Sequence, residues 1–134
     1  MILVIGGTGT TGSAVVKALT GAGEKVRVLA RSPEKAKAIA GPNVEFVKGD
    51  LADPKSLDAA FKGADRVFLV SAPDPNVGTL HGNAFAAAKK AGAKHLVRLS
   101  ALGADPRSPV SLFKLHVETD AALDKAGVPL TVLR

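Results

Sequence analysis

The sequence predicts an α/β fold, with six parallel strands in one sheet and helices on both of its faces. Two observations predict it. Apolar runs rich in β-branched residues alternate with helical patterns along the whole chain. The runs are almost continuously apolar, as in strands that are buried on both faces. Strands that alternate with helices are joined by right-handed crossovers, so the sheet should be doubly wound, with the strand order 3-2-1-4-5-6.

The six strands are expected where the apolar runs fall. In chain order they are residues 2–5, 26–30, 44–47, 66–70, 95–100 and 130–133. Five helical segments separate them, which gives five strand–helix cycles and a final strand. A solenoid with a repeat of about 20 residues is the alternative, but the helical segments differ too much in sequence to be copies of one unit.

The ends of the expected helices carry recognisable signals. Ser32 before Pro33, and Asp53 before Pro54, are N-cap residues followed by proline in the first helical position. Glycines then stand where each helix must turn back, because glycine accepts the left-handed conformation there. These glycines are Gly21 or Gly23, Gly41, Gly63, Gly92 and Gly127.

Length and composition are those of one domain over residues 1–134, of which 46% are hydrophobic. No apolar stretch approaches the roughly 20 residues of a membrane span. The first residues, MILVIGG, lack the basic flank and cleavage site of a signal peptide, so we expect a cytoplasmic protein with no membrane partner. The chain has no cysteine, which excludes disulfides and thiolate chemistry.

The chain carries 18 Lys and Arg against 12 Asp and Glu, a net charge of +6. Such an excess favours nucleic acid, a phosphorylated small molecule, or solubility alone. The cations are scattered, and the five Phe residues are not interleaved with them as in RNA-binding motifs. We therefore expect a solvated basic surface and no nucleic-acid partner.

A glycine-rich segment, GGTGTTG, directly follows the first strand and opens the first helix. In that position Gly6, Gly9 and Gly12 match the dinucleotide fingerprint of a Rossmann domain. Gly6 permits the sharp turn, Gly9 lets a pyrophosphate approach the backbone, and Gly12 lets the helix pack against the sheet. The hydroxyls available as additional donors are those of Thr8, Thr10, Thr11 and Ser13. The alternative is a tight turn without a ligand; a P-loop is excluded because no GK[ST] follows.

The end of the second strand distinguishes the two nicotinamide dinucleotides. An acid there would accept from the 2′-hydroxyl of NAD(H), and a cation would pair with the 2′-phosphate of NADP(H). Here the strand ends with Ala30 and Arg31 and no acid, so NADP(H) is favoured over NAD(H). Ser32, Lys35 or Arg27 could assist. The alternative is that Arg31 is an exposed residue at the edge of a loop.

Asp50 and Leu51 follow the third strand, where a pocket for the adenine ring would lie. Asp53, slightly further on, is expected only to cap its helix.

Six segments then cover almost the whole chain. They read VIGGTGTTGSAVVKAL, VRVLARSPEKA, VEFVKGDLADPKSL, ADRVFLVSAP, AAKKAGAKHLVRLSALGA and LHVETDAALDKAGVPLTVLR. In this order they resemble the NmrA-like, atypical short-chain dehydrogenase/reductase family, which includes NAD(P)H-dependent quinone reductases and redox-sensing regulators.

The resemblance implies a role for each matching position. The glycines Gly6, Gly9 and Gly12 would bind the pyrophosphate, Arg31 the 2′-phosphate, and Asp50 with Leu51 the adenine. Ser71, Ala72 and Pro73, after the fourth strand, would lie along the nicotinamide-side ribose. Ser100 occupies the place of the family's catalytic serine; the other interpretation is a strand-end hydroxyl bonded to backbone.

One departure concerns catalysis, because the classical short-chain dehydrogenases use a YxxxK in the next helix and this chain contains no tyrosine. The comparable stretch is LFKLH, with Leu112 at the tyrosine place and His116 at the lysine place. His116 could bind ribose or donate a proton near neutral pH; a surface histidine without a role is the alternative. His81 and His95 have no ligand spacing around them, so we predict no metal site.

A second departure is that family members continue past LR into a segment that builds the substrate pocket, so the chain resembles the cofactor-binding half alone. Two interpretations of function follow. One is an NADPH-dependent oxidoreductase that passes hydride to a quinone-like small molecule. The other is a binding module without turnover: a sensor-like domain, or a truncated, consensus or designed Rossmann scaffold. An apolar face left open by an absent segment would promote self-association.

Overall fold

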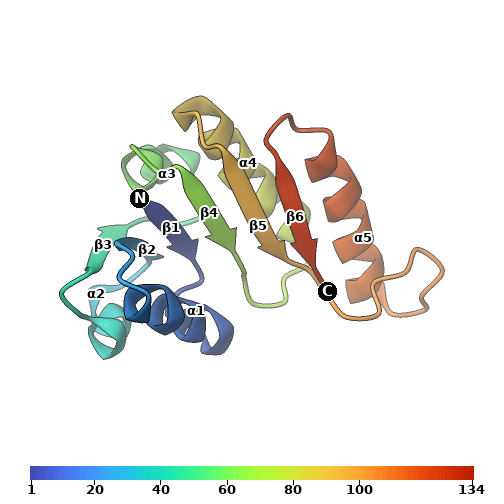
Figure 1. Cartoon of the computed structure of the whole chain (residues 1–134). Helices are drawn as coiled ribbons and strands as arrows, with labels where there is room; N and C mark the ends of the chain where they lie inside the picture. Colours follow the sequence, from blue (N-terminus) through green and yellow to red (C-terminus); the bar gives the residue numbers. More distant parts are fainter.

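Six parallel strands form one sheet, in the order β3-β2-β1-β4-β5-β6, in the computed structural model of the chain (Figure 1). The structure describes the backbone of residues 1–134 and every side chain except that of Pro33. The strands are β1 (Ile2–Ile5), β2 (Val26–Ala30), β3 (Val44–Lys48), β4 (Arg66–Leu69), β5 (His95–Leu99) and β6 (Leu130–Leu133). The predicted order is therefore confirmed. β3 is one residue longer than expected, and β4 and β5 each end one residue earlier.

Five α-helices and one 3-10 turn connect the strands. They are α1 (Thr10–Gly21), α2 (Pro33–Ala36), η1 (Lys37–Ile39), α3 (Pro54–Phe61), α4 (Val77–Ala91) and α5 (Ser111–Asp124). Asp53 caps α3 as predicted, its side chain accepting from the Lys55 amide at 3.1 Å. Ser32 occupies the N-cap position of α2, but its side chain makes no capping hydrogen bond.

The predicted glycine stops are confirmed at four positions. Gly23, Gly63, Gly92 and Gly127 have positive φ, whereas Gly21 is the last residue of α1. The expectation for Gly41 was wrong, because the segment after β2 ends in the η1 turn. The residue that leaves this turn, Ala40, is extended, so no left-handed residue is needed.

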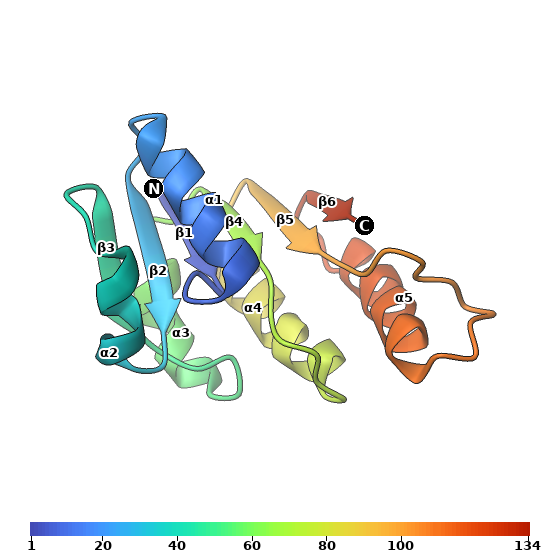
Figure 2. The ribbon, with the colours of Figure 1, turned by 90° about the horizontal axis from the view of Figure 1, so that it is seen from below.

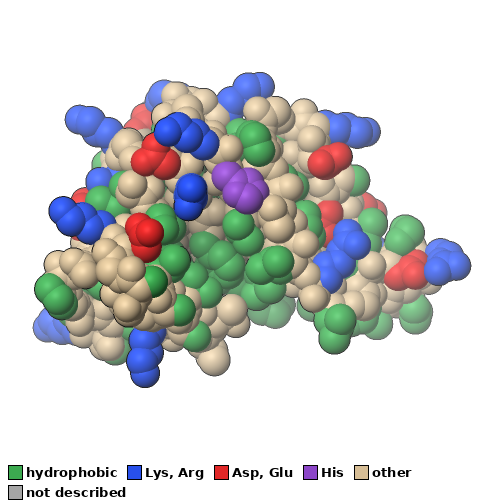
Figure 3. Space-filling model, viewed as in Figure 1, with side chains coloured by type: hydrophobic (Ala, Val, Ile, Leu, Met, Phe, Trp, Pro, Cys, Tyr) green, Lys and Arg blue, Asp and Glu red, His purple; other side chains and the backbone are tan. Residues whose placement is uncertain are grey.

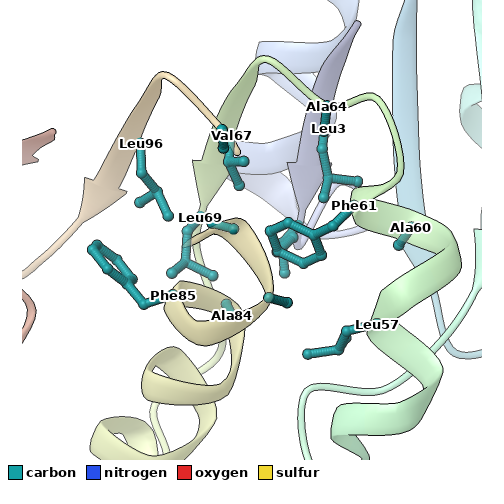
Figure 4. Close-up of a cluster of buried hydrophobic side chains, with 14 of the residues drawn as sticks. Leu3, Leu57, Ala60, Phe61, Ala64, Val67, Leu69, Ala84, Phe85 and Leu96 are labelled. Carbon is teal, nitrogen blue, oxygen red and sulfur yellow. The ribbon is translucent and has the colours of Figure 1, made fainter. Parts of the chain in front are cut away.

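Alternate side chains of the strands enter two cores on opposite faces of the sheet. Leu3 of β1 points toward α3 and α4, where Phe61 and Phe85 lie (Figure 4), and Ile5 belongs to the same buried cluster. Val4, between them, packs with Val16 of α1. Figure 2 shows α1 on one side of the sheet and α4 and α5 on the other. Both faces are thus used, as a doubly wound fold requires.

Over β5 and β6 the α1 side of the sheet carries no helix of the described residues (Figure 1). Val97, Leu99 and Leu133 lie on this side and are partly exposed, Leu133 by 44%. Figure 3 shows hydrophobic side chains gathered on the same face, between α1 and the loop that precedes α5. None of the helices in the described part of the chain has the length and apolar character needed to cross a membrane.

Candidate functional site

A cavity of about 560 Å³ lies at the carboxyl edge of the sheet, where the loops after β1, β2, β3 and β4 converge. β1 is at the switch point, since the chain winds toward β2 on one side and toward β4 on the other. Twelve residues predicted to contact a dinucleotide line this cavity: Gly6, Thr8, Gly9, Thr10, Thr11, Gly12, Arg31, Asp50, Leu51, Ser71, Ala72 and Pro73. Ser13, Ser32 and Lys35, considered as further donors or assistants, do not line it.

The glycines of the first loop serve different needs. Gly6 has φ of +80°, and a Cβ there would overlap the carbonyl of Val70. The sequence predicted that Gly12 lets α1 pack against the sheet. In the structure a Cβ on Gly12 would overlap the carbonyl of Gly6, so the close approach is between α1 and the loop that follows β1. Gly7 is the residue that approaches the sheet, because its Cβ would lie 2.7 Å from Val28 Cγ1.

Gly9 differs from Gly6, Gly7 and Gly12, because no atom of the described residues would overlap a Cβ placed on it. A Cβ there would meet nothing closer than the Gly6 carbonyl oxygen, at 3.4 Å, and its backbone is extended at φ −86° and ψ 177°. Any residue could adopt this conformation. Since Gly9 lines the cavity, the space beside it can hold the atoms of a ligand.

The first turn of α1 points its amides toward the same space. Gly9 is the N-cap and has no side chain to offer, and no acidic residue lies in this turn. The first amides of a helix have no partner within the helix, and the helix dipole adds partial positive charge. Thr8, Thr10 and Thr11, which carry hydroxyls, line the cavity around them. This arrangement suits a phosphate group.

Arg31 is exposed at the end of β2 and lines the cavity. Within the described residues it takes part in no ion pair, so its guanidinium is available to an anion. Arg27 was considered as an assistant, but the structure does not bring it to the cavity. Its side chain bonds to Glu45 and to the carbonyls of Ala60 and Lys62.

The loop after β3 is fixed by its own hydrogen bonds. The Asp50 carboxylate accepts from the Ala52 amide at 2.9 Å, and the Asp50 amide donates to Ser56 Oγ. Asn83 of α4 donates to the Leu51 carbonyl at 2.8 Å, which ties the loop to the neighbouring helix. No local pattern pointed to Asn83, because its partner lies 32 residues away.

Ser71 connects the cavity to a buried polar group. Its Oγ lies 2.9 Å from Nε2 of His81, a residue of α4 that is 1% exposed. Burial lowers the pKa of His81 to about 3, and the nearby positive charge of Arg98 contributes. The ring is therefore neutral at physiological pH.

Ser100 and His116 do not line this cavity, although the sequence grouped them with the site. Ser100 Oγ donates to Asp120 Oδ2 at 2.8 Å, so a carboxylate satisfies the hydroxyl instead of backbone. Arg98 Nη2 donates to His116 Nδ1 at 3.0 Å. Partial burial, and the Arg98 charge, lower the pKa of His116 and favour its neutral form. A catalytic role for either residue stays a prediction.

Two residues that organise this region were not predicted from the sequence. Arg98 is 0% exposed in β5, and it forms an ion pair with Asp120 of α5, which is also buried. One signal was available: Arg98 is a charged residue within the apolar run HLVRLS. A charged side chain is almost never fully buried without a partner, so this residue indicated a buried ion pair. No group of three metal-ligating side chains occurs among the residues that the structure describes.

Comparisons with known proteins agree with this geometry. The sequence model of a protein family described as NAD(P)H-binding matches residues 6–134. An NAD(P)H azoreductase of Xenophilus azovorans is 37% identical over 134 residues, which are 100% of this chain and 47% of that protein. The chain spans about half the length of the curated relatives it matches.

Many solved structures are similar to this chain, and two of them match it over its whole length. An NADPH-dependent quinone oxidoreductase from Escherichia coli, complexed with NADPH, has a TM-score of 0.90 and 32% sequence identity; the match covers 100% of this chain and 48% of that one. A Citrobacter triphenylmethane reductase, complexed with NADP(H), has a TM-score of 0.89 and 31% identity, with 100% and 49% coverage.

Proposed function

The chain belongs to the NAD(P)H-binding family, and from that premise we propose that it holds NADP(H) in the cavity at the carboxyl edge of its sheet. Its resemblance to NmrA-like, atypical short-chain dehydrogenases is confirmed. It is an NAD(P)H-binding Rossmann domain, similar to the cofactor-binding half of reductases and quinone oxidoreductases. We propose that residues 1–134 act as one such domain.

The observation that carries this proposal is the open space beside Gly9. The described chain does not use that space, and the first-turn amides of α1 border it. The pyrophosphate would accept hydrogen bonds from these amides and from the threonine hydroxyls. Asp50 and Leu51 would border the adenine, and Ser71, Ala72 and Pro73 would lie along the nicotinamide-side ribose.

A preference for NADP(H) rests on Arg31. Its guanidinium would pair with the 2′-phosphate, a group that NAD(H) lacks. The expected test is calorimetric titration with NADPH and NADH at one salt concentration, because phosphate contacts are screened by salt. Arg31→Ala should weaken NADPH binding about tenfold to a hundredfold, the range of a charge-assisted hydrogen bond. NADH binding should change by less than about twofold.

Arg66→Ala is the matched control. Arg66 is an exposed arginine at the amino end of β4, on the edge of the sheet opposite the cavity, so the substitution removes the same net charge. It should leave both affinities unchanged. Equal losses for NADPH and NADH in Arg31→Ala would remove Arg31 from phosphate recognition.

The proposed activity is hydride transfer to a quinone-like acceptor, as the names of the relatives suggest. Bound NADPH would supply the hydride, and the chain would orient it. The alternative is a module that binds without turnover. Two observations favour it: the Ser100 hydrogen is already donated to Asp120, and neither Ser100 nor His116 lines the cavity. Loss of NADPH absorbance with a simple benzoquinone would support the enzyme, and saturable binding without oxidation would support the module.

We also propose that the partly exposed face over β5 and β6 allows self-association. Leu133 and Val97 lie there, and Leu102, in the loop after β5, is 83% exposed. Sedimentation over a range of protein concentrations should then show a dimer whose population falls in Leu133→Glu. A concentration-independent monomer would contradict the proposal.

A further inference from the structure

A buried polar chain runs from the cavity into the layer between β5 and helices α4 and α5. It starts at Ser71, passes through His81 of α4 and Arg98 of β5, and ends at Asp120 of α5. The side chains of His81 and Arg98 are 1% and 0% exposed. No described buried side-chain nitrogen or oxygen lacks a hydrogen-bond partner. The neighbours of each group in this hydrogen-bonded series therefore determine which atoms carry hydrogen.

The constraint begins at Arg98, because a guanidinium donates hydrogen bonds and cannot accept them. Arg98 Nε donates to His81 Nδ1 at 2.9 Å, so Nδ1 must carry a lone pair. A neutral imidazole then has its hydrogen on Nε2. That nitrogen lies 2.9 Å from Ser71 Oγ and donates to it.

Ser71 consequently keeps its own hydrogen. Its Oγ accepts from His81, and no second hydrogen bond of this hydroxyl is present among the described residues. Because Ser71 lines the cavity, the hydroxyl hydrogen is left for an acceptor inside it. Ser100 is the opposite case, because its hydrogen is already committed to Asp120.

Asp120 keeps Arg98 in place. Its Oδ1 accepts from Arg98 Nη1, and its Oδ2 accepts from Ser100 and, at 3.3 Å, from Arg134. A buried guanidinium without a counter-charge would be strongly destabilising. The ion pair thus holds Nε in the orientation that His81 Nδ1 needs.

We propose that Arg98 and Asp120 are positioning residues that fix the Nε2-protonated tautomer of His81, so that Ser71 donates a hydrogen bond to an acceptor oxygen of the nicotinamide-side ribose. This inference rests on the proposed binding of NADP(H) in the cavity. The buried chain acts through Ser71 alone and does not itself touch the ligand.

The first test reads the tautomer in the free protein and needs no ligand. Nitrogen-15 NMR of the full chain should show His81 with a protonated Nε2 and an unprotonated Nδ1 at neutral pH. Arg98→Lys should populate both tautomers, because an ammonium cannot reproduce the geometry of the guanidinium fork. A protonated Nδ1, or two tautomers in the parent protein, would overturn the proposal. If Arg98→Lys does not fold, the parent spectrum still decides.

The second test separates the two halves of the ligand. Ser71→Ala should weaken NADPH binding about fivefold to tenfold, the contribution of one hydrogen bond. It should leave the affinity for adenosine 2′,5′-bisphosphate unchanged, since that probe lacks the nicotinamide-side ribose. Ser71→Thr keeps the hydroxyl and should restore NADPH binding. Equal losses for both probes would mean a structural role and overturn the proposal.

A matched pair at His81 tests the link between tautomer and ligand. His81→Gln keeps an amide donor near the place of Nε2, whereas His81→Asn keeps a polar group only near the place of Nδ1. NADPH affinity should survive in His81→Gln and fall in His81→Asn about as far as in Ser71→Ala. The reverse order would contradict the inference. If neither probe bound the folded parent, the proposed function itself would fail, while the NMR result would still report the tautomer.

Discussion

Gly9, the N-cap of α1, and Gly12, in the first turn of that helix, lie three residues apart, yet only Gly12 is needed by the chain itself. A Cβ on Gly12 would overlap the Gly6 carbonyl, so Gly12→Ala should lower the free energy of unfolding by at least about 2 kcal/mol. Gly9→Val fits an extended backbone with open space beside it and should stay within about 1 kcal/mol of the parent. Its side chain would occupy the phosphate position and abolish NADPH binding.

Urea denaturation and calorimetric titration of the two variants measure both quantities. NADPH binding by Gly9→Val with the parent affinity, or an equal loss of stability in both variants, would contradict these separate roles.

His81 makes stability depend on pH. Its pKa is about 3 in the folded chain and near 6.5 when unfolded, so between these values the unfolded state binds the extra proton. The free energy of unfolding should therefore fall as pH drops from about 6.5 toward 3, by up to about 1.4 kcal/mol per pH unit. His116 acts in the same direction, because its pKa is also lowered.

Urea denaturation over this pH range should show a shallower slope in His81→Gln than in the parent. His95→Gln is the control, because His95 pairs with Thr131 at a partly exposed position. The control should keep the parent slope. An unchanged slope in His81→Gln would remove His81 from acid destabilisation.

At the scale of elements, two helices with the same N-cap and proline pattern end up with different caps. The Asp53 side chain bonds to the Lys55 amide of α3, whereas the Ser32 side chain makes no such bond at α2. Asp53→Ala should therefore lower the free energy of unfolding by about 1 kcal/mol. Ser32→Ala should change it by less than about 0.5 kcal/mol. Urea denaturation of both variants is the measurement, and equal effects would contradict the difference in capping.

The elements themselves could be predicted because their signals are local. Apolar runs, caps and most turn glycines are readable within a few residues, and they located all six strands. The prediction that Gly41 ends a helix in the left-handed conformation was wrong, because the segment after β2 is a short helix that ends in a 3-10 turn. Val70 and Ser100 continue the apolar runs in sequence but belong to the loops that follow β4 and β5.

The loops that form the candidate site could be predicted from the sequence, but the buried polar side chains that support them could not. Carboxyl ends of parallel strands meet at one edge, so residues after β1, β2, β3 and β4 had to converge. The pairing of Arg98 with His81 and Asp120 joins residues 17 and 22 positions apart, from a strand and two helices. Nothing in local periodicity specifies which inward-facing polar groups will meet across such a layer.

At the scale of the whole molecule, the convergence of the loops after β1, β2, β3 and β4 predicts where a bound ligand slows hydrogen exchange. NADPH should slow amide exchange together in residues 6–12, 49–51 and 70–72, by a factor that approaches 1 + [L]/Kd for amides that exchange through local opening. The turns around Gly23, Gly63 and Gly92 lie at the opposite edge and serve as the internal control. Their exchange should not change, because local opening there leaves the cavity intact. Protection confined to the glycine loop would mean that only a phosphate is held, and equal protection at both edges would contradict binding in this cavity.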